Sequence, residues 1–390
     1  MSRREVFEFL TANAQATDSA TLTRHFDGGD DLLPLWIAEP YIEVAPAISE
    51  ALRSRAGTGW YGYETRPDTA ISEFWSWMAA RHDWDGSQLA TVVSPSVGTS
   101  IGVLLDLFTD PGSGVILQPP AFSDFKALVA AAGRRVVRNP VELTPQGYRM
   151  DLDGLAASAS DPSTRAIILC NPHNPVGRVW TPNELAEFAT VCARHEVFVI
   201  ADEIHADLTL APHVFTPFST VAAESGVSWA ALHGPIKTFG LAGVCDTLLI
   251  AEHPHVTERF EERSSQLHLT RNNVFGLAAF DAAYRTGAPW LDDMMSLVAT
   301  NRDLLKDNLA DGIELCDLEG TYMAWLDCRG LQMDVPTLAH WLASSARLGL
   351  SPGHWFGREG AGFARMTIAT PTSWIELAIE RLNRAVAERS

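Results

Sequence analysis

Residues 165–205 read RAIILCNPHNPVGRVWTPNELAEFATVCARHEVFVIADEIH, with two apolar runs on either side of an amphipathic stretch. The runs are RAIILCNP at 165–172 and VFVIADEIH at 197–205, and TPNELAEFATVCARHE at 181–196 lies between them. Near-continuous apolar strands joined by a helix are typical of a parallel sheet covered on both faces. This stretch therefore predicts a strand–helix–strand unit of an α/β fold.

The same alternation extends from about residue 90 to residue 285. Its other apolar runs are GVILQPP at 114–120, WAALHG at 229–234 and DTLLIAE at 246–252. We therefore predict a large domain at 46–287 in which a mostly parallel sheet of seven-stranded type lies between helices.

The C-terminal third has a different pattern, in which helices surround short strands. Helical patterns cover 301–312, 335–349 and 373–389, and the short strands lie near 322–327 and 363–368. This pattern predicts a smaller α/β domain at 288–390. We expect the N-terminal segment, 1–45, to pack with it.

Composition excludes several classes of function. The net charge of −19 and the pI near 5.0 argue against a nucleic-acid or anionic-membrane surface, which needs clustered Lys and Arg. The sequence has no run of about 18 apolar residues, and its N-terminus has no signal-peptide core. Five cysteines without a CxxC pair fit reduced thiols better than disulfides. We expect a cytoplasmic protein without a metal site.

Three strand ends carry distinctive chemistry. Asn174 follows the run at 165–172, Asp202 ends the next, and Lys237 follows WAALHG. Ligands of open α/β sheets bind beyond the carboxyl ends of strands. Pyridoxal 5′-phosphate needs three partners: a lysine amine for its aldehyde, an acid for its ring nitrogen and a donor for its phenolate oxygen. Lys237, Asp202 and Asn174 can fill these roles, which predicts this cofactor, with Lys237 as the catalytic residue that holds it as a Schiff base.

The other lysines suit this role poorly. Of the 29 basic residues, only Lys126, Lys237 and Lys306 are lysines. Lys126 and Lys306 lie in helical patterns that suggest solvated positions. Lys237 lies in an apolar stretch, where a purely structural lysine is uncommon.

The blocks NPHNPVG, ADEIH and KTFGLAG resemble the signature blocks of the fold-type I class I/II aminotransferase superfamily. Five further blocks resemble the branch of the MalY/PatB-type cystathionine β-lyases. They are LPLWIAEP (33–40), WYGYETRPD (60–68), AAYRTGAPWL (282–291), GTYMAWLD (320–327) and LSPGHWFGREGAGFARM (350–366). The resemblance runs in order from about residue 30 to residue 385.

The resemblance implies further cofactor contacts. Phe122 matches the aromatic residue that stacks on the pyridine ring. Val97, Gly98 and Thr99 match the phosphate-binding turn, where a helix N-terminus offers free N–H groups to an anion. His205 either contacts the cofactor or fills space.

Two further residues are matched. Tyr63 corresponds to a tyrosine that reaches the phosphate of the partner subunit's cofactor, which implies a homodimer with shared active sites. Arg365 corresponds to the arginine that binds the α-carboxylate of an amino-acid substrate, a task that suits a guanidinium fork.

The chain differs from the family at three positions near Lys237, two of which commonly bind the cofactor's phosphate. Gly234 stands where a serine is common, Cys245 where many relatives have an arginine, and Gly240 where asparagine is usual. As a hypothesis, the cofactor is held more weakly, or His233 or Arg271 substitutes.

The chain also differs from the family in the segment that shapes the entrance to the substrate site. WIAEPYIEV (36–44) replaces a WVADMDFPV-like stretch, which favours a substrate other than cystathionine, such as a bulkier cysteine S-conjugate.

The reaction that the resemblance favours is C–S β-elimination, which releases a thiol, pyruvate and ammonia from a cysteine S-conjugate. An aminotransferase is the first alternative. The second is decarboxylation or oxidative deamination on the same scaffold. A non-catalytic regulator is disfavoured, because a scaffold has no physical need for Lys237, Asp202, Asn174 and Arg365 together.

Overall fold

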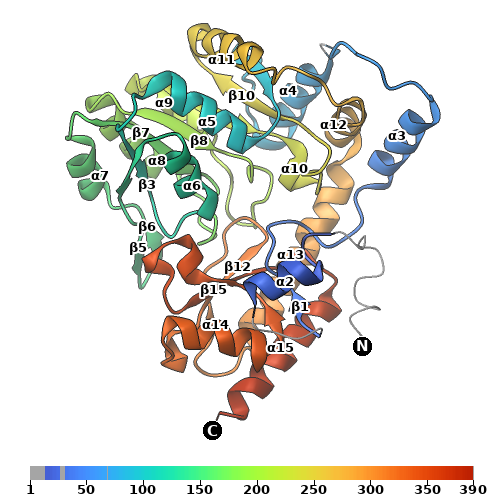
Figure 1. Cartoon of the computed structure of the whole chain (residues 1–390), viewed down its shortest axis with the longest axis vertical. Coiled ribbons are helices and arrows are strands. Elements are labelled where there is room, and N and C mark those ends of the chain that lie inside the picture. Colours follow the sequence, from blue (N-terminus) through green and yellow to red (C-terminus); the bar gives the residue numbers. More distant parts are fainter. Residues whose placement is uncertain (1–13, 27–30, 68, 390) are drawn as a thin grey trace.

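The computed structural model describes residues 14–26, 31–67 and 69–389, which fold into two stacked parts (Figure 1). The upper part is built on a seven-stranded sheet with the order β2-β10-β9-β8-β7-β3-β4. In this sheet β10 runs opposite to the other six strands. The strands are β2 Ala90–Ser94, β3 Gly114–Leu117, β4 Arg135–Arg138, β7 Thr164–Cys170, β8 Phe198–Asp202, β9 Trp229–His233 and β10 Thr247–Ala251. The predicted α/β fold with a mostly parallel sheet is confirmed.

Helices cover both faces of this sheet because its central strands are apolar on both sides. Adjacent residues of β7 show the alternation, since Ile168 and Ile167 pack into separate apolar clusters on opposite faces. The face of Ile168 is covered by α5 Val97–Phe108, α6 Ser123–Ala131 and α11 Pro254–Gln266. The face of Ile167 is covered by α4 Thr69–His82, α7 Leu152–Ala159, α8 Pro182–Arg194, α9 Phe218–Ser225 and α12 Val274–Thr286.

The sequence patterns missed the two edge strands of the sheet, β2 and β4. Strand β4 reads RVVR, and its two arginines, Arg135 and Arg138, are exposed. Edge strands are short and lie partly in solvent, so they lack the continuous apolar run that reveals a central strand.

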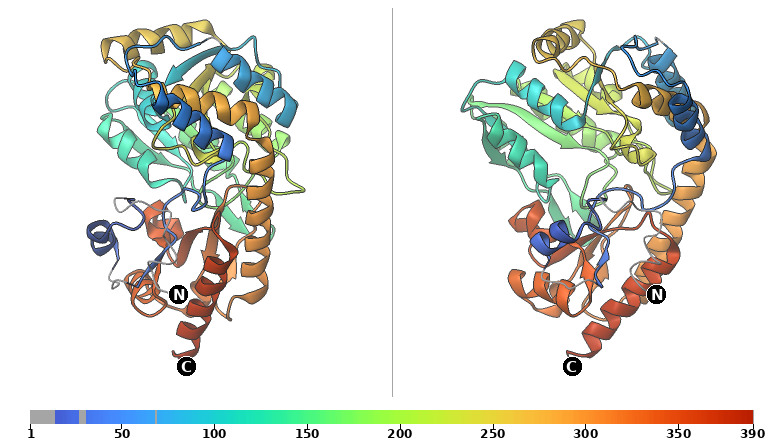
Figure 2. Two further views of the ribbon diagram at one scale, coloured as in Figure 1. Left: turned by 90° about the vertical axis from the view of Figure 1, so that its right-hand side faces the viewer. Right: turned by 45° about the vertical axis from the view of Figure 1, so that its right-hand side comes forward.

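The lower part holds a four-stranded antiparallel sheet of order β11-β12-β15-β14. Figure 2 shows the long helix α13, Ala288–Asn308, running from the upper part down beside it. The strands are β11 Glu314–Leu315, β12 Met323–Asp327, β14 Ser351–Pro352 and β15 Phe363–Thr367. The remaining elements here are α14 Val335–Ser344, α15 Thr372–Ala387 and the 3-10 turns η1 Arg329–Leu331, η2 Gly353–Phe356 and η3 Arg358–Gly360.

The described N-terminal residues contact the lower part. Strand β1, Leu33–Pro34, pairs in parallel with β13, Leu348–Gly349. Helix α2, Ser19–His25, joins an apolar cluster there, whereas α3, Pro46–Gly57, packs on α12. The proposed domain boundaries stay a prediction, and residues 1–13 and 27–30 of the N-terminal segment lie outside the described residues.

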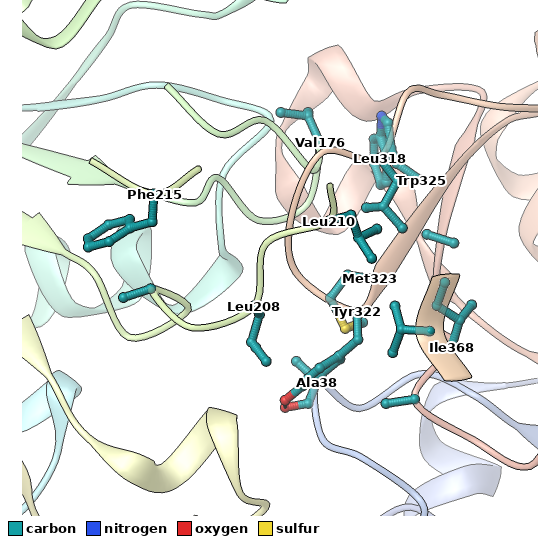
Figure 3. Packing of buried hydrophobic residues seen from close by; sticks show 14 of the residues in the cluster. Ala38, Val176, Leu208, Leu210, Phe215, Leu318, Tyr322, Met323, Trp325 and Ile368 are labelled. Carbon is teal, nitrogen blue, oxygen red and sulfur yellow. Dashed lines mark hydrogen bonds between the residues drawn. The ribbon is translucent and has the colours of Figure 1, made fainter. Parts of the chain in front are cut away.

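The loops that follow β7 and β8 join the two parts. Figure 3 shows Val176 and Leu208 of these loops in one apolar cluster with Leu318 and Tyr322. Backbone hydrogen bonds reinforce the junction, because Thr321 N donates to Leu208 O at 2.6 Å. A β-hairpin, β5 Glu142–Thr144 with β6 Gly147–Arg149, completes the fold. The carboxyl ends of β7 and β8 therefore face the lower part, at the junction between the two parts.

Candidate active site

Lys237 lies just beyond β9, in the one-turn helix α10, Pro235–Thr238. Its Nζ donates a hydrogen bond of 2.6 Å to Ala38 O. Burial, followed by the charge of Arg365, lowers the pKa of Lys237 to about 8, although Glu39 acts in the opposite direction. A larger share of this amine is therefore neutral near pH 7 than for an ordinary lysine, and a neutral amine is what attacks an aldehyde. Lys126 and Lys306 are exposed.

Asp202 ends strand β8 beside the carboxyl end of β7, where it is paired in register with Cys170. It is buried, and its Oδ1 accepts a hydrogen bond of 3.2 Å from Ile204 N. Burial raises the pKa of Asp202 to about 6, with the hydrogen bond from Ile204 and the charge of Lys237 acting against it. A buried carboxylate of this kind gains from any cation brought to it, such as a protonated pyridine nitrogen.

Arg365 connects the smaller sheet to the loop after β7. Its Nη1 donates to Asn174 Oδ1 at 3.1 Å, and its Nη2 donates to Trp36 O at 2.8 Å and to Ser351 Oγ at 3.3 Å. The guanidinium lies over the ring of Phe356, 4.7 Å from its centroid. Burial lowers the pKa of Arg365 to about 10, so the side chain stays charged at neutral pH.

His205 lies at the same site and is buried. Burial, and then the charges of Lys237 and Arg365, hold the pKa of His205 well below its usual value, so the ring is neutral. Its Nδ1 and the Nε of Arg365 have no hydrogen-bond partner among the described residues. Buried polar atoms are normally paired, so these two atoms fit a site that receives a polar ligand.

The turn at the N-terminus of α5, predicted to bind the phosphate, has geometry that suits an anion. Ser96 caps the helix: its Oγ accepts from Thr99 N at 3.1 Å and lies 2.9 Å from Thr99 Oγ1. The N–H groups of Val97 and Gly98 have no acceptor within the helix, and an atom added at Gly98 meets nothing closer than 3.9 Å. Two N–H groups and a helix dipole can therefore receive a phosphate here.

Phe122 caps α6 just beyond β3, half-buried and edge-on to Phe125 at 5.5 Å between centroids. The structure therefore puts it at the same edge of the sheet as the other strand-end residues. Its stacking role stays a prediction.

The structure bears on one departure at the phosphate and on one proposed substitute. At Gly234 an added Cβ lies 3.1 Å from Thr247 Cα, which leaves little room for a serine. The prediction that His233 substitutes at the phosphate is wrong. Its Nε2 is hydrogen-bonded to Glu203 Oε2 at 2.8 Å in the core, and its ring packs near Phe74. Proximity along the sequence to Lys237 did not reveal which way this strand residue faces.

Tyr63 and Arg271 contact each other at the surface and have no hydrogen bond to the other predicted residues within the described ranges. Tyr63 is 85% exposed, and Arg271 donates to its hydroxyl at 3.3 Å while lying over its ring. Both residues line a surface hollow of about 1060 Å³. One chain thus brings together Lys237, Asp202, Asn174, His205 and Arg365, with no recorded contact to Tyr63.

The sequence patterns missed several contacts of the site. Backbone oxygens of Trp36 and Ala38 hold Arg365 and Lys237, and Tyr322 also donates to Ala38 O at 3.3 Å. Backbone acceptors leave no signal in residue identity. The only available signal is that WIAEP belongs to one of the family blocks.

The comparisons with known proteins agree with this geometry. Residues 36–382 match the family model of class I and II aminotransferases. The chain belongs to this family. It is 31% identical to cystathionine β-lyase PatB of Bacillus subtilis over 92% of the chain and 94% of that protein. It is 30% identical to protein MalY of Escherichia coli, with coverages of 92% and 93%.

Solved structures of the family show the same fold. Cystalysin of Treponema denticola, whose crystal structure contains pyridoxal 5′-phosphate, superposes with a TM-score of 0.90 at 26% identity, covering 98% of each chain. The predicted membership of the MalY/PatB-type branch is confirmed. Within the described ranges, no helix is long and apolar enough to cross a membrane, and no three His, Cys, Asp or Glu residues are grouped to hold a metal.

Proposed function

We propose that this protein is a pyridoxal 5′-phosphate-dependent C–S β-lyase that cleaves a cysteine S-conjugate, cystathionine-like or bulkier. The products are a thiol, pyruvate and ammonia. The observation that carries the proposal is the placement of Lys237, Asp202 and Arg365 around one site, in a chain whose relatives include cystathionine β-lyases. The two orphaned atoms, His205 Nδ1 and Arg365 Nε, fit a polar cofactor and substrate.

Each residue has a role that its geometry allows. Lys237 binds the cofactor aldehyde and, once the substrate amine has freed it, takes the proton from Cα. Asp202 holds a proton at the ring nitrogen. Asn174 accepts from Arg365 through Oδ1, which leaves its Nδ2 to donate to the phenolate oxygen. Val97, Gly98 and Thr99 receive the phosphate, and Phe122 packs on the ring.

Arg365 orients the substrate. Its guanidinium is already fixed by Asn174, Ser351 and the backbone of Trp36, so it can bind the α-carboxylate without first being ordered. When bound, the cofactor supplies an electron sink for the electrons left at Cα. The thiolate then leaves from Cβ, and hydrolysis of the remaining fragment yields pyruvate and ammonia.

We also propose a homodimer with shared active sites. Three aromatic side chains of one segment are unusually exposed for a single chain, namely Trp60 at 56%, Tyr61 at 54% and Tyr63 at 85%. Exposed aromatic clusters mark interfaces. The proposed location is the cytoplasm, supported by the five free cysteines.

The test is pyruvate release from L-cystathionine and from bulkier cysteine S-conjugates, with the cofactor supplied and no oxo acid present. Sustained release that is lost in Lys237→Ala supports the lyase. A single conversion of the bound cofactor to its amine form, without pyruvate, contradicts the lyase and favours the aminotransferase.

A further inference from the structure

A buried carboxylate, Asp207, lies outside the contacts described so far. It follows β8 by five residues and accepts three hydrogen bonds, each of 2.8 Å. Trp77 Nε1 and His82 Nε2, both from α4, reach its Oδ1, and Thr238 Oγ1 reaches its Oδ2. Thr238 is the residue directly after Lys237.

Asp207 lies in the turns that directly follow Asp202, the last residue of β8. In these two successive turns Ala206 N donates to Glu203 O, and Leu208 N donates to His205 O at 2.9 Å. The bond from Thr238 to Asp207 therefore joins the segment that carries Lys237 to the segment that carries Asp202.

Helix α10 needs such a support. It is a single turn whose N-cap makes no side-chain hydrogen bond, and a lone helical turn is unstable by itself. The amine of Lys237 is held by Ala38 O only while the amine is free. The bond between Thr238 and Asp207 is independent of the state of that amine.

The surroundings keep Asp207 ionised. Burial by itself raises the pKa of Asp207, but the hydrogen bonds and charge of His82, together with bonds from Trp77 and Thr238, hold it below its usual value. Arg81 Nε lies 4.0 Å away, and Tyr284 of α12 also faces the group. A buried carboxylate with three donors holds its partners in place. Loss of any one donor leaves a buried charge with an unsatisfied oxygen, which is destabilising.

We propose that Asp207 is a positioning residue that acts through Thr238 to fix Lys237 relative to Asp202. The two cofactor contacts, at the aldehyde and at the ring nitrogen, are thereby held at a set separation. This inference rests on the proposed pyridoxal phosphate function. The alternative is that Asp207 only joins α4 to the loop and contributes stability.

Two variants separate these roles, because each removes one donor to the same carboxylate. Thr238→Val removes the hydroxyl beside Lys237 with little change of shape, and Trp77→Phe removes the indole N–H on α4. Thr238→Ser restores the hydroxyl. Thr238→Ala is the second test if the valine variant does not fold.

The readouts are the pH titration of bound-cofactor absorbance, kcat, KM and the thermal unfolding midpoint. We expect Thr238→Val to shift the pH midpoint of the absorbance titration and to lower kcat roughly 10- to 100-fold, with KM nearly unchanged. A small misplacement of a reacting group lowers a rate by about this factor. Thr238→Ser should restore both values. Trp77→Phe should lower the unfolding midpoint while the titration stays in place.

Equal effects of Thr238→Val and Trp77→Phe on the titration would overturn the proposal, and so would a Thr238→Val holoenzyme with an unchanged titration. The lyase proposal is tested separately: it fails if the wild-type protein releases no pyruvate. The absorbance titration needs only bound cofactor and still decides the role of Asp207.

Discussion

The two ends of the site are built differently. The ring end, defined by Asn174, Asp202, Lys237 and Arg365, is buried and hydrogen-bonded within one chain. The phosphate end, defined by residues 97–99 with Gly234 and Cys245, offers backbone N–H groups, a glycine and a thiol. Arg66 is one cation near this edge, and it pairs with Asp246. The difference supports the proposed homodimer, in which a second copy of the chain completes the phosphate end.

The largest expected effect is at the ring end. Asp202→Asn should lower kcat for pyruvate release about 10²- to 10³-fold, because an amide does not hold the ring proton that stabilises charge in the reaction. Asp124→Asn is the control, since Asp124 is an exposed carboxylate whose charge also acts on Lys237. A loss of equal size in both variants would show that only net charge matters.

The same substitution should stabilise the cofactor-free protein. Burial raises the pKa of Asp202 to about 6, whereas a free aspartate has 3.8. Stability is therefore lost as the pH rises through this window, by about 3 kcal/mol in all, and an asparagine does not titrate. Thermal unfolding of Asp202→Asn and wild-type apoprotein should differ most above about pH 6 and least near pH 4. A constant difference would contradict the assignment.

A smaller effect is expected where the substrate binds. Arg365→Lys should raise KM roughly 10- to 100-fold, because an ammonium cannot reproduce the guanidinium's bidentate contact. The exposed Arg358→Lys serves as the control. Unchanged KM in Arg365→Lys would remove Arg365 from carboxylate binding and would weaken the contrast between the two ends.

Arg271 is the remaining proposed substitute at the phosphate, so Arg271→Ala should weaken cofactor binding by about tenfold, a typical value for one charge-assisted hydrogen bond. The affinity for pyridoxal, which has no phosphate, should not change. Titrations of the apoprotein with both compounds measure this, and Arg263→Ala, at a partly exposed arginine paired with Asp106, is the control. An equal loss for both compounds would place Arg271 elsewhere than at the phosphate.

The smallest effect concerns Glu39. Its carboxylate raises the pKa of Lys237, so Glu39→Gln should move the pH midpoint for the reaction of apoprotein with pyridoxal from about 8 toward lower pH. The rate near pH 7 should rise less than about tenfold. Glu43→Gln, an exposed neighbour, should leave the midpoint in place, and a matching shift there would exclude a local effect.

The sequence revealed elements with a strong physical signal. Strands β7, β8 and β9 are buried on both faces and gave continuous apolar runs, whereas the edge strands β2 and β4 gave none. Lys237, Asp202 and Asn174 were predicted because residues of these types follow strands in the sequence, and their roles stay predictions.

Other features have no such signal. The backbone oxygens of Trp36 and Ala38 and the hydroxyl of Ser351 depend on how distant segments meet, which residue types do not record. The prediction for His233 was wrong for the same reason, because the direction of its side chain is set by packing against Phe74 of α4 and against Trp84.

The most direct test of the central claim is to reduce the holoprotein with borohydride and map the modified peptide by mass spectrometry. Only three lysines are available, Lys126, Lys237 and Lys306. The account predicts one pyridoxyl group, on the peptide that contains Lys237. A group on Lys126 or Lys306, or an unmodified chain in a protein that shows the cofactor's absorbance, would contradict it.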